Sequence, residues 1–255
     1  MARVTIFHTS DMHNKLTPGL AERLRDLVQS HPNSLMLDSG DAIWSGNIFW
    51  RPGGEPILDL MSSVPYDAMC MGNREFHFLS AGLVTKTSRA RFPVLSANLR
   101  SAKHVRPGHV VPDASLRTCS PLPSAAFELD GIRVSVFGLS VPCITERMLV
   151  KKVSDYYFAE PVEAAAEIIP TLRKECDVLV ALTHIGIKRD TELAETVPGI
   201  DVIIGGHTHT LAEERVGETH ILHSGMHAHY VRKVEIELKA GKVGVKTELI
   251  GLGKA

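Results

Sequence analysis

The segment Asp201-Val202-Ile203-Ile204-Gly205-Gly206-His207-Thr208-His209 decides how this 255-residue chain is interpreted. Its apolar, β-branched residues predict a buried strand, and the glycines and histidines after them predict a loop at the tip of that strand. Neutral imidazole is the commonest side-chain ligand of metal ions, so the pair His207 and His209 is a candidate metal site. A single His-x-His pattern carries little weight alone, and other parts of the chain must supply further ligands.

Four other predicted strands also lead into residues of metal-binding type. These strands cover residues 3–8, 34–37, 66–71 and 178–182. The residues that follow them are Asp11 and His13, then Asp41, then Asn73, then His184. Taken singly, each has a structural interpretation as a turn, a cap or a satisfied core residue. Together they indicate a common site, because strand ends in an α/β sheet share one edge.

The seven side chains at this edge comprise two carboxylates, four imidazoles and one amide. This mixture suits two divalent cations such as Mn²⁺, Fe, Zn²⁺ or Ni²⁺ better than a thiolate zinc site or an all-oxygen calcium site. Two such ions about 3.5–4 Å apart could clamp a phosphate and generate a hydroxide near neutral pH. The four cysteines are scattered without a Cys-x-x-Cys pair, which favours reduced structural thiols.

The remaining segments complete the expected α/β pattern. Helices are predicted over residues 16–29, 56–62, 81–89, 161–174 and 191–196, a further strand over 92–96, and a hairpin over 126–139. Three segments, 220–224, 230–238 and 242–250, predict an antiparallel tail. Residues 44–54 are typical of an irregular loop rich in glycine and aromatic residues that could wall the site, and residues 101–123 of an irregular surface segment.

Composition excludes several classes of protein. The 28 basic and 29 acidic residues give a net charge of −1, so no electrostatic footprint for nucleic acid or an anionic membrane is present. No apolar run approaches the roughly 20 residues needed to span a bilayer. The N-terminus enters a strand without a signal-peptide pattern, so we expect a cytoplasmic protein. No linker or repeat divides the chain, and we expect one domain over residues 1–255.

Five ordered motifs carry a family resemblance. They are Asp11-x-His13, Gly40-Asp41, Gly72-Asn73-x-Glu75, Thr183-His184 and Gly206-His207-x-His209. In this order they resemble the motifs of the calcineurin-like metallophosphoesterases. The sequences of residues 7–13 and 203–209 look most like the branch of 5′-nucleotidases and cyclic-nucleotide phosphodiesterases. The resemblance covers residues 4 to about 240.

The resemblance implies an α/β fold with four layers, an α/β/β/α sandwich with mixed sheets, around a dinuclear metal site. One metal ion would be held by Asp11, His13, Asp41 and His209. The other would be held by Asp41, Asn73, His184 and His207. Asp41 would bridge the two ions, and a bridging hydroxide would attack phosphorus in line.

Two positions depart from the family pattern. The third motif of the family has a histidine between the Asn and the Glu, often paired with an aspartate three residues on, where this chain has Arg74 and His77. Arg74 can bind phosphate but cannot donate a proton, because its pKa exceeds about 12. If Asn73 opens a helix, positions 74 and 77 share a face, and His77 could protonate the leaving oxygen. The alternative is that His77 only packs.

These observations predict a metal-dependent phosphoric ester hydrolase acting on a small phosphate ester, such as a nucleotide. Two alternatives stay open: a phosphodiesterase of cyclic nucleotides or other diesters, and a catalytically degenerate module that binds metal or nucleotide. The periplasmic 5′-nucleotidases of this type carry a C-terminal domain that sandwiches the nucleobase, and this sequence does not include one. The resemblance therefore leaves nucleoside specificity unassigned.

Overall fold

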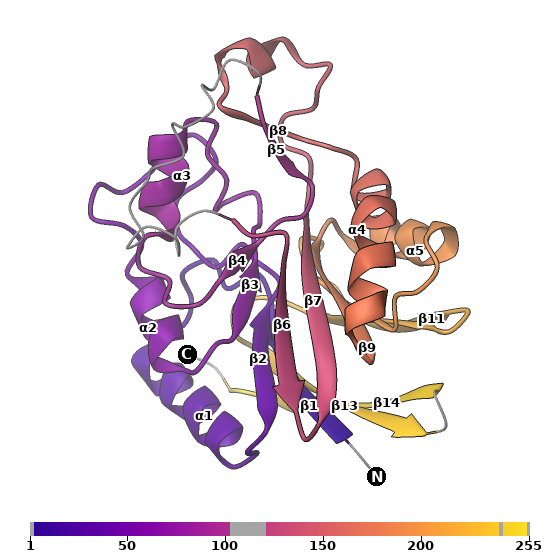
Figure 1. Cartoon of the computed structure of the whole chain (residues 1–255). Coiled ribbons are helices and arrows are strands. Elements are labelled where there is room, and N and C mark those ends of the chain that lie inside the picture. Colours follow the sequence, from indigo (N-terminus) through magenta and orange to yellow (C-terminus); the bar gives the residue numbers. More distant parts are fainter. Residues whose placement is uncertain (1–2, 103–120, 240–241, 254–255) are drawn as a thin grey trace.

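The structure is a computed structural model that describes residues 3–102, 121–239 and 242–253. Two six-stranded mixed sheets form its centre (Figure 1). The first sheet has the strand order β14-β13-β1-β2-β3-β4. Its members are β1 (Arg3–Thr9), β2 (Ser34–Asp38), β3 (Ala68–Cys70), β4 (Val94–Leu95), β13 (Tyr230–Lys239) and β14 (Lys242–Gly251). Strands β1 to β4 are parallel, and β13 joins β1 antiparallel.

The second sheet has the strand order β11-β12-β10-β9-β7-β6. Its members are β6 (Ser124–Leu129), β7 (Ile132–Ser140), β9 (Val178–His184), β10 (Val202–Gly205), β11 (Leu211–Val216) and β12 (Thr219–Ser224). The four inner strands are parallel, and the two edge strands β6 and β11 are antiparallel to their neighbours. Two short strands, β5 (Leu99–Ser101) and β8 (Tyr156–Phe158), pair separately.

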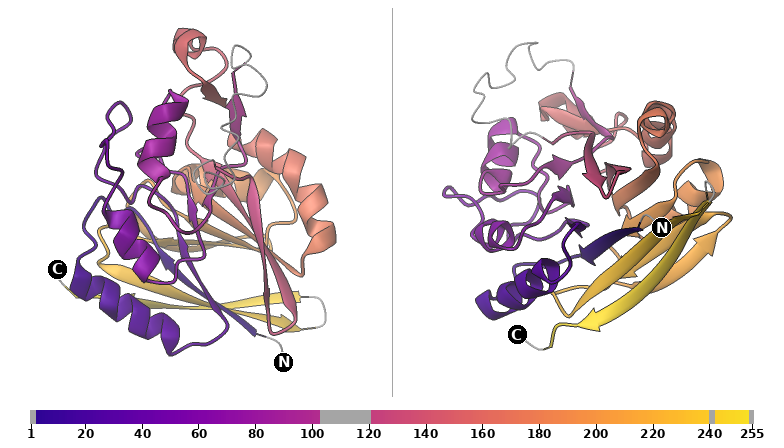
Figure 2. Two further views of the ribbon diagram at one scale, coloured as in Figure 1. Left: turned by 60° about the vertical axis from the view of Figure 1, so that its left-hand side comes forward. Right: turned by 60° about the horizontal axis from the view of Figure 1, so that its bottom comes forward.

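Helices cover the outer faces of the two sheets, so that four layers result (Figure 2). The first sheet is covered by α1 (Pro18–Gln29), α2 (Ile57–Ser63) and α3 (Ser80–Thr87). The second is covered by α4 (Pro161–Glu175) and α5 (Ile187–Thr196). A short 3₁₀ helix spans Leu149–Val153. The implied α/β/β/α sandwich with mixed sheets is confirmed.

The alternation of side chains along each inner strand divides the apolar residues among three cores. Along β9, Val178 and Val180 point between the sheets, whereas Leu179 and Ala181 point toward the helices. Both faces of these strands are buried, which explains their continuous apolar sequences. Among the described residues no helix is long and apolar enough to cross a membrane.

Most predicted elements are present within a few residues of their expected ends, but the predicted antiparallel tail is wrong in part. Strand β12 does not pair with β13; it lies parallel to β10 in the second sheet, whereas β13 and β14 form a hairpin beside β1 in the first. Strand β11 is not among the predicted elements. The predicted irregular segment over 101–123 falls mostly on residues 103–120, which lie outside the described residues.

Candidate metal centre

The ends of four parallel strands, two from each sheet, bring carboxylates and imidazoles together. Donor atoms of Asp11, Asp41 and His184 lie within 4.8 Å of one another, and so do those of Asp11, His13 and His209. Asp11 and Asp41 follow β1 and β2, whereas His184 ends β9 and His209 follows β10. The site therefore spans the junction between the two sheets.

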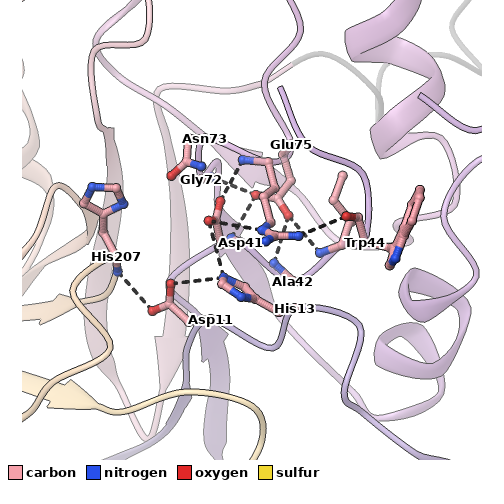
Figure 3. Close-up of polar contacts among 12 residues, drawn as sticks. Asp11, His13, Asp41, Ala42, Trp44, Gly72, Asn73, Glu75 and His207 are labelled. Atoms are coloured by element: carbon pink, nitrogen blue, oxygen red, sulfur yellow. Dashed lines mark hydrogen bonds and ion pairs between the residues drawn. The ribbon is translucent and has the colours of Figure 1, made fainter. Parts of the chain in front are cut away.

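Asp11 and two histidines form one half of this cluster. Oδ1 of the buried Asp11 carboxylate lies 3.3 Å from Nε2 of His209 and 3.8 Å from Nε2 of His13. Its other oxygen, Oδ2, accepts hydrogen bonds from Ser10 Oγ and from the backbone N–H of His207, the latter at 3.0 Å. Figure 3 shows Asp11 between His207 and His13. Oδ1 is thereby left to face the two imidazoles.

Asp41 lies between the two halves of the cluster. Its Oδ2 is 3.5 Å from Nε2 of His13, and its Oδ1 is 3.4 Å from Nε2 of His184. The Oδ1 atom of Asn73 lies 3.3 Å from the same His184 nitrogen. The His207 ring packs against the His184 ring, with 5.0 Å between the centroids, and the His209 ring packs against that of His13 at 4.8 Å. All seven predicted ligands thus lie in one connected group.

A hydrogen bond at Nδ1, on the side of the ring away from Asp41, fixes the orientation of His184. Its Nδ1 lies 2.7 Å from the backbone carbonyl oxygen of Ser39, which can only accept. Nδ1 therefore carries a hydrogen, and Nε2 is the atom that faces Asp41 and Asn73. A second partner that fixes the tautomer in this way is usual for metal-binding histidines.

Five of the candidate ligands have left-handed backbone. The φ angles are 50° at Asp11, 44° at His13, 56° at Asp41, 80° at His207 and 57° at His209. Non-glycine residues rarely adopt this region, and those that do cluster at functional sites. Hydrogen bonds from the N–H of Asp11 to Gly40 O and from the N–H of His13 to Asp41 O, both 3.0 Å, hold the first two loops together.

The glycines before His207 let the strand tip approach the site closely. A Cβ at Gly206 would lie 2.5 Å from Ser10 Oγ and 2.9 Å from Asp11 Oδ2. A Cβ at Gly205 would overlap both His223 Nε2 and Asp190 Oδ2. Only a residue without a side chain fits at either position unless these neighbours move.

Glu75 orients the loop that carries Asp41, a role that sequence reasoning missed although Glu75 belongs to the third motif. Its fully buried carboxylate accepts hydrogen bonds from the backbone N–H groups of Asp41, Ala42 and Gly72, each at 2.9 Å. Figure 3 shows Glu75 beside Asp41, on the side away from His207. Burial and the nearby Asp41 charge raise the pKa of Glu75.

The cluster attracts positive charge. Burial alone would lower the pKa of His184, but the Asp41 carboxylate and other nearby acids outweigh it and raise this pKa to about 9. Burial likewise opposes ionisation of Asp41, yet His184, His13 and the Arg74 N–H hold its pKa well below the usual range. A metal ion would compete with a proton for the same negative potential.

Arg74 and His77 have different neighbours around the third-motif turn. The backbone N–H of Arg74 donates to Asp41 Oδ1 at 2.7 Å, and its guanidinium donates from Nη1 to Trp44 O at 2.9 Å, with Nε 3.7 Å from Asp41 Oδ2. His77 is buried, and its Nε2 and Nδ1 lie near the carbonyl oxygens of Ile48 and Leu79. Residues 73–75 form a turn rather than a helix, so the condition for a shared face is not met.

Two buried atoms of the cluster, Asp11 Oδ1 and His13 Nε2, have no hydrogen-bond partner among the described residues. Buried polar atoms are nearly always satisfied, and both of these face the centre of the cluster. Carboxylate, imidazole and amide donors around unsatisfied buried atoms fit divalent metal ions. The residues present therefore suit the metal centre that the sequence predicted.

A two-sheet α/β sandwich with this donor set at the strand ends defines a metallophosphoesterase. The chain belongs to the calcineurin-like phosphoesterases, because the model of that family matches residues 4–211. It is 32% identical to the trifunctional nucleotide phosphoesterase YfkN of Bacillus subtilis over 83% of this chain and 16% of that protein. It is 31% identical to the 5′-nucleotidase of Naja atra venom over 81% of this chain and 41% of that one.

Solved structures show the same fold. The 5′-nucleotidase precursor of Thermus thermophilus superimposes with a TM-score of 0.78 at 24% identity, covering 98% of this chain and 54% of that one. The Bacillus subtilis YfkN structure gives a TM-score of 0.73 at 20% identity, over 98% and 91% of the two chains. The chain spans less than half the length of each of the two curated relatives named above.

Proposed function

We propose that this protein is a metal-dependent phosphoric ester hydrolase with a dinuclear centre, acting on nucleotides or similar small phosphate monoesters. The observation that carries the proposal is the pair of unsatisfied buried atoms, Asp11 Oδ1 and His13 Nε2, within a cluster of acid and imidazole donors. The nucleotide preference rests on the names of the related enzymes alone.

We also propose that the chain folds as one domain, since the two sheets share an apolar core.

One metal ion would be held by Asp11, His13, Asp41 and His209, and the other by Asp41, Asn73, His184 and His207. The position of Asp41 between His13 and His184 supports a shared role for its carboxylate. When bound, the two ions would supply a hydroxide nucleophile and stabilise negative charge on the phosphate oxygens. Mn²⁺, Fe, Zn²⁺ and Ni²⁺ all accept such donors.

Arg74 would bind the phosphate. Its guanidinium is partly exposed, lies beside Asp41 and uses one N–H for Trp44 O among the described hydrogen bonds. Further N–H groups stay available for phosphate oxygens, and the fixed positive charge would offset charge that develops during hydrolysis. Arg74 would not protonate the leaving group.

For His77 we propose the packing role rather than the acid role. Its ring is buried and stacks on Phe78; Nδ1 accepts a hydrogen bond from the backbone N–H of Leu79 at 3.0 Å, and Nε2 lies 3.3 Å from the carbonyl oxygen of Ile48. Replacing His77 with Ala should then lower activity on alkyl and aryl phosphates by the same factor. A loss confined to alkyl phosphates, whose leaving groups need a proton, would restore the acid role.

The proposed function is tested with purified protein, added Mn²⁺ and two substrates, p-nitrophenyl phosphate and its bis-ester. We expect faster turnover of the monoester, loss of activity on chelation and recovery on adding metal back. An Asp41→Asn variant serves as the inactive control. Preference for the bis-ester would favour a phosphodiesterase, and metal binding without turnover of either ester would favour a degenerate binding module.

A further inference from the structure

Residues 44–50, here called the aromatic loop, lie a few residues after Asp41 and are held by three basic side chains. The carbonyl of Trp44 accepts from Arg74 Nη1 at 2.9 Å. The carbonyl of Gly46 accepts from Lys86 Nζ at 2.6 Å. The carbonyl of Ile48 lies 3.3 Å from His77 Nε2. Alternate carbonyls from Trp44 to Ile48 thus meet a basic side chain from residues 74–77 or from α3.

Lys86 is the least expected of the three. It projects from α3 and is fully buried. Its ammonium donates to three carbonyls: Gly46 at 2.6 Å, Arg74 at 2.6 Å and Phe76 at 3.0 Å. These bonds use all three of its N–H groups, and no carboxylate lies within ion-pair distance of it in the part of the chain that the structure describes.

Burying this charge is costly. Desolvation lowers the pKa of Lys86 to about 8, although Glu75 and Glu55 partly offset that effect. A methionine or leucine could fill similar volume without a desolvation penalty. The fold gains little from an ammonium here except a fixed geometry between α3 and the two segments to which it bonds, the aromatic loop and the 74–76 turn.

That geometry includes the placement of Arg74. Lys86 bonds to the carbonyl of Arg74 on one side and to the aromatic loop, through Gly46, on the other. The Arg74 guanidinium bonds to the same loop at Trp44, and its Nε lies 3.7 Å from Asp41 Oδ2. The Arg74 side chain thus runs from the 74–76 turn to the aromatic loop, and Lys86 is hydrogen-bonded to both of these segments.

We infer that Lys86 is a positioning residue that ties the aromatic loop to the 74–76 turn and thereby aims the Arg74 guanidinium at the phosphate of the substrate. The inference rests on the proposed function. It assigns to a buried lysine of α3 a role in anion binding at a site whose ligands come from other segments.

A double-mutant cycle tests it. Lys86→Met keeps the length of the side chain and removes its donors, Arg74→Gln removes the guanidinium, and the pair combines both. Lys174→Met, at an exposed position in the last turn of α4, is the matched control. The readouts are kcat and KM for p-nitrophenyl phosphate, and the Kd of inorganic phosphate for metal-loaded protein by calorimetry.

We expect each single variant at 74 and 86 to weaken phosphate binding about tenfold, and the double variant to be no weaker than Arg74→Gln alone. The loss in Lys86→Met should fall in the same kinetic parameter as the loss in Arg74→Gln. Additive losses would overturn the inference, because they would mean that Lys86 does not act through Arg74.

The experiment still tests the inference if Lys86→Met fails to fold or if the proposed function is wrong. If Lys86→Met does not fold, Lys86→Gln, whose shorter amide has two N–H groups and so loses at least one of the three donated bonds, enters the same cycle and is judged by the same coupling. If the wild type hydrolyses no ester, the proposed function fails, while the phosphate Kd values still decide whether Lys86 acts through Arg74.

Discussion

At the scale of single residues, His207 and His209 contact different partners although only one residue separates them. His209 faces Asp11 and His13, whereas the ring of His207 packs on His184. Replacing His209 with Ala should remove mainly the metal ion held with Asp11. Replacing His207 with Ala should remove mainly the ion held with Asn73. Elemental analysis of both variants checks this, and equal loss of both ions from either variant would contradict the division.

Metal binding should strengthen as pH rises. Below the pKa of about 9 that His184 has beside Asp41, its imidazole carries a proton that an incoming metal must displace. Each pH unit between about 6.5 and 8.5 should then raise the apparent Mn²⁺ affinity by about tenfold for that proton. Calorimetry in buffers of different ionisation enthalpy measures the released proton. An affinity that does not change with pH would show that no proton is displaced.

The seven candidate metal ligands could be predicted because each is a residue of metal-binding type that follows an apolar run. The residue type and the apolar run are both visible in the sequence. Arg74 and His77 were harder to interpret. Their partners are the backbone carbonyls of Trp44 and Ile48, which any residue offers, so no sequence pattern indicates them. Lys86 was not predicted for the same reason, since its three acceptors are also carbonyls.

At the scale of elements, the tip of β10 depends on close packing. Gly206→Ala would place a methyl group against Ser10 Oγ and Asp11 Oδ2. We expect a loss of roughly 1–3 kcal/mol in the free energy of unfolding, together with weaker metal binding. Gly19→Ala in the first turn of α1, where nothing lies within 4 Å, is the control and should not destabilise. Denaturant unfolding measures both, and equal stability of the two variants would count against the packing argument.

Strand pairing was the part of the fold that the sequence did not reveal. The sequence predicts a strand over residues 220–224 but does not indicate its neighbour, and β12 pairs with β10 on one side and with the unpredicted β11 on the other. Strand β11 itself is an edge strand whose residues Glu213, Glu214 and Arg215 are exposed, so it lacks a buried face. A periodicity argument needs such a face.

At the scale of the whole molecule, His8 connects the two sheets. Its Nε2 lies 2.6 Å from Ser39 Oγ and its Nδ1 lies 2.5 Å from Ser224 Oγ, at the ends of β2 and β12. Burial, with the nearby His223 and Arg232, holds the pKa of His8 well below 6.5. The unfolded chain therefore takes up a proton below pH 6.5 that the folded protein does not.

This difference predicts acid sensitivity. The free energy of unfolding should fall as pH drops below about 6.5, with a contribution from His8 of up to about 1.4 kcal/mol per pH unit. In His8→Gln that contribution should be missing, so its stability profile should be flatter than that of the wild type between about pH 6.5 and 5. Denaturant titrations at several pH values in this range give the slope of the free energy of unfolding against pH for both proteins. Parallel profiles would show that His8 titrates alike in the folded and unfolded chain.

The left-handed backbone at Asp11, His13, Asp41, His207 and His209 has a consequence for how this sequence can change. Each such residue opposes folding, whereas glycine or asparagine at the same position would relieve the strain. A library selected for heat resistance alone, without metal, should therefore replace these residues early and leave the three apolar cores intact. Substitutions at these five positions would therefore indicate that selection for activity has been relaxed, and they would not indicate a loss of stability.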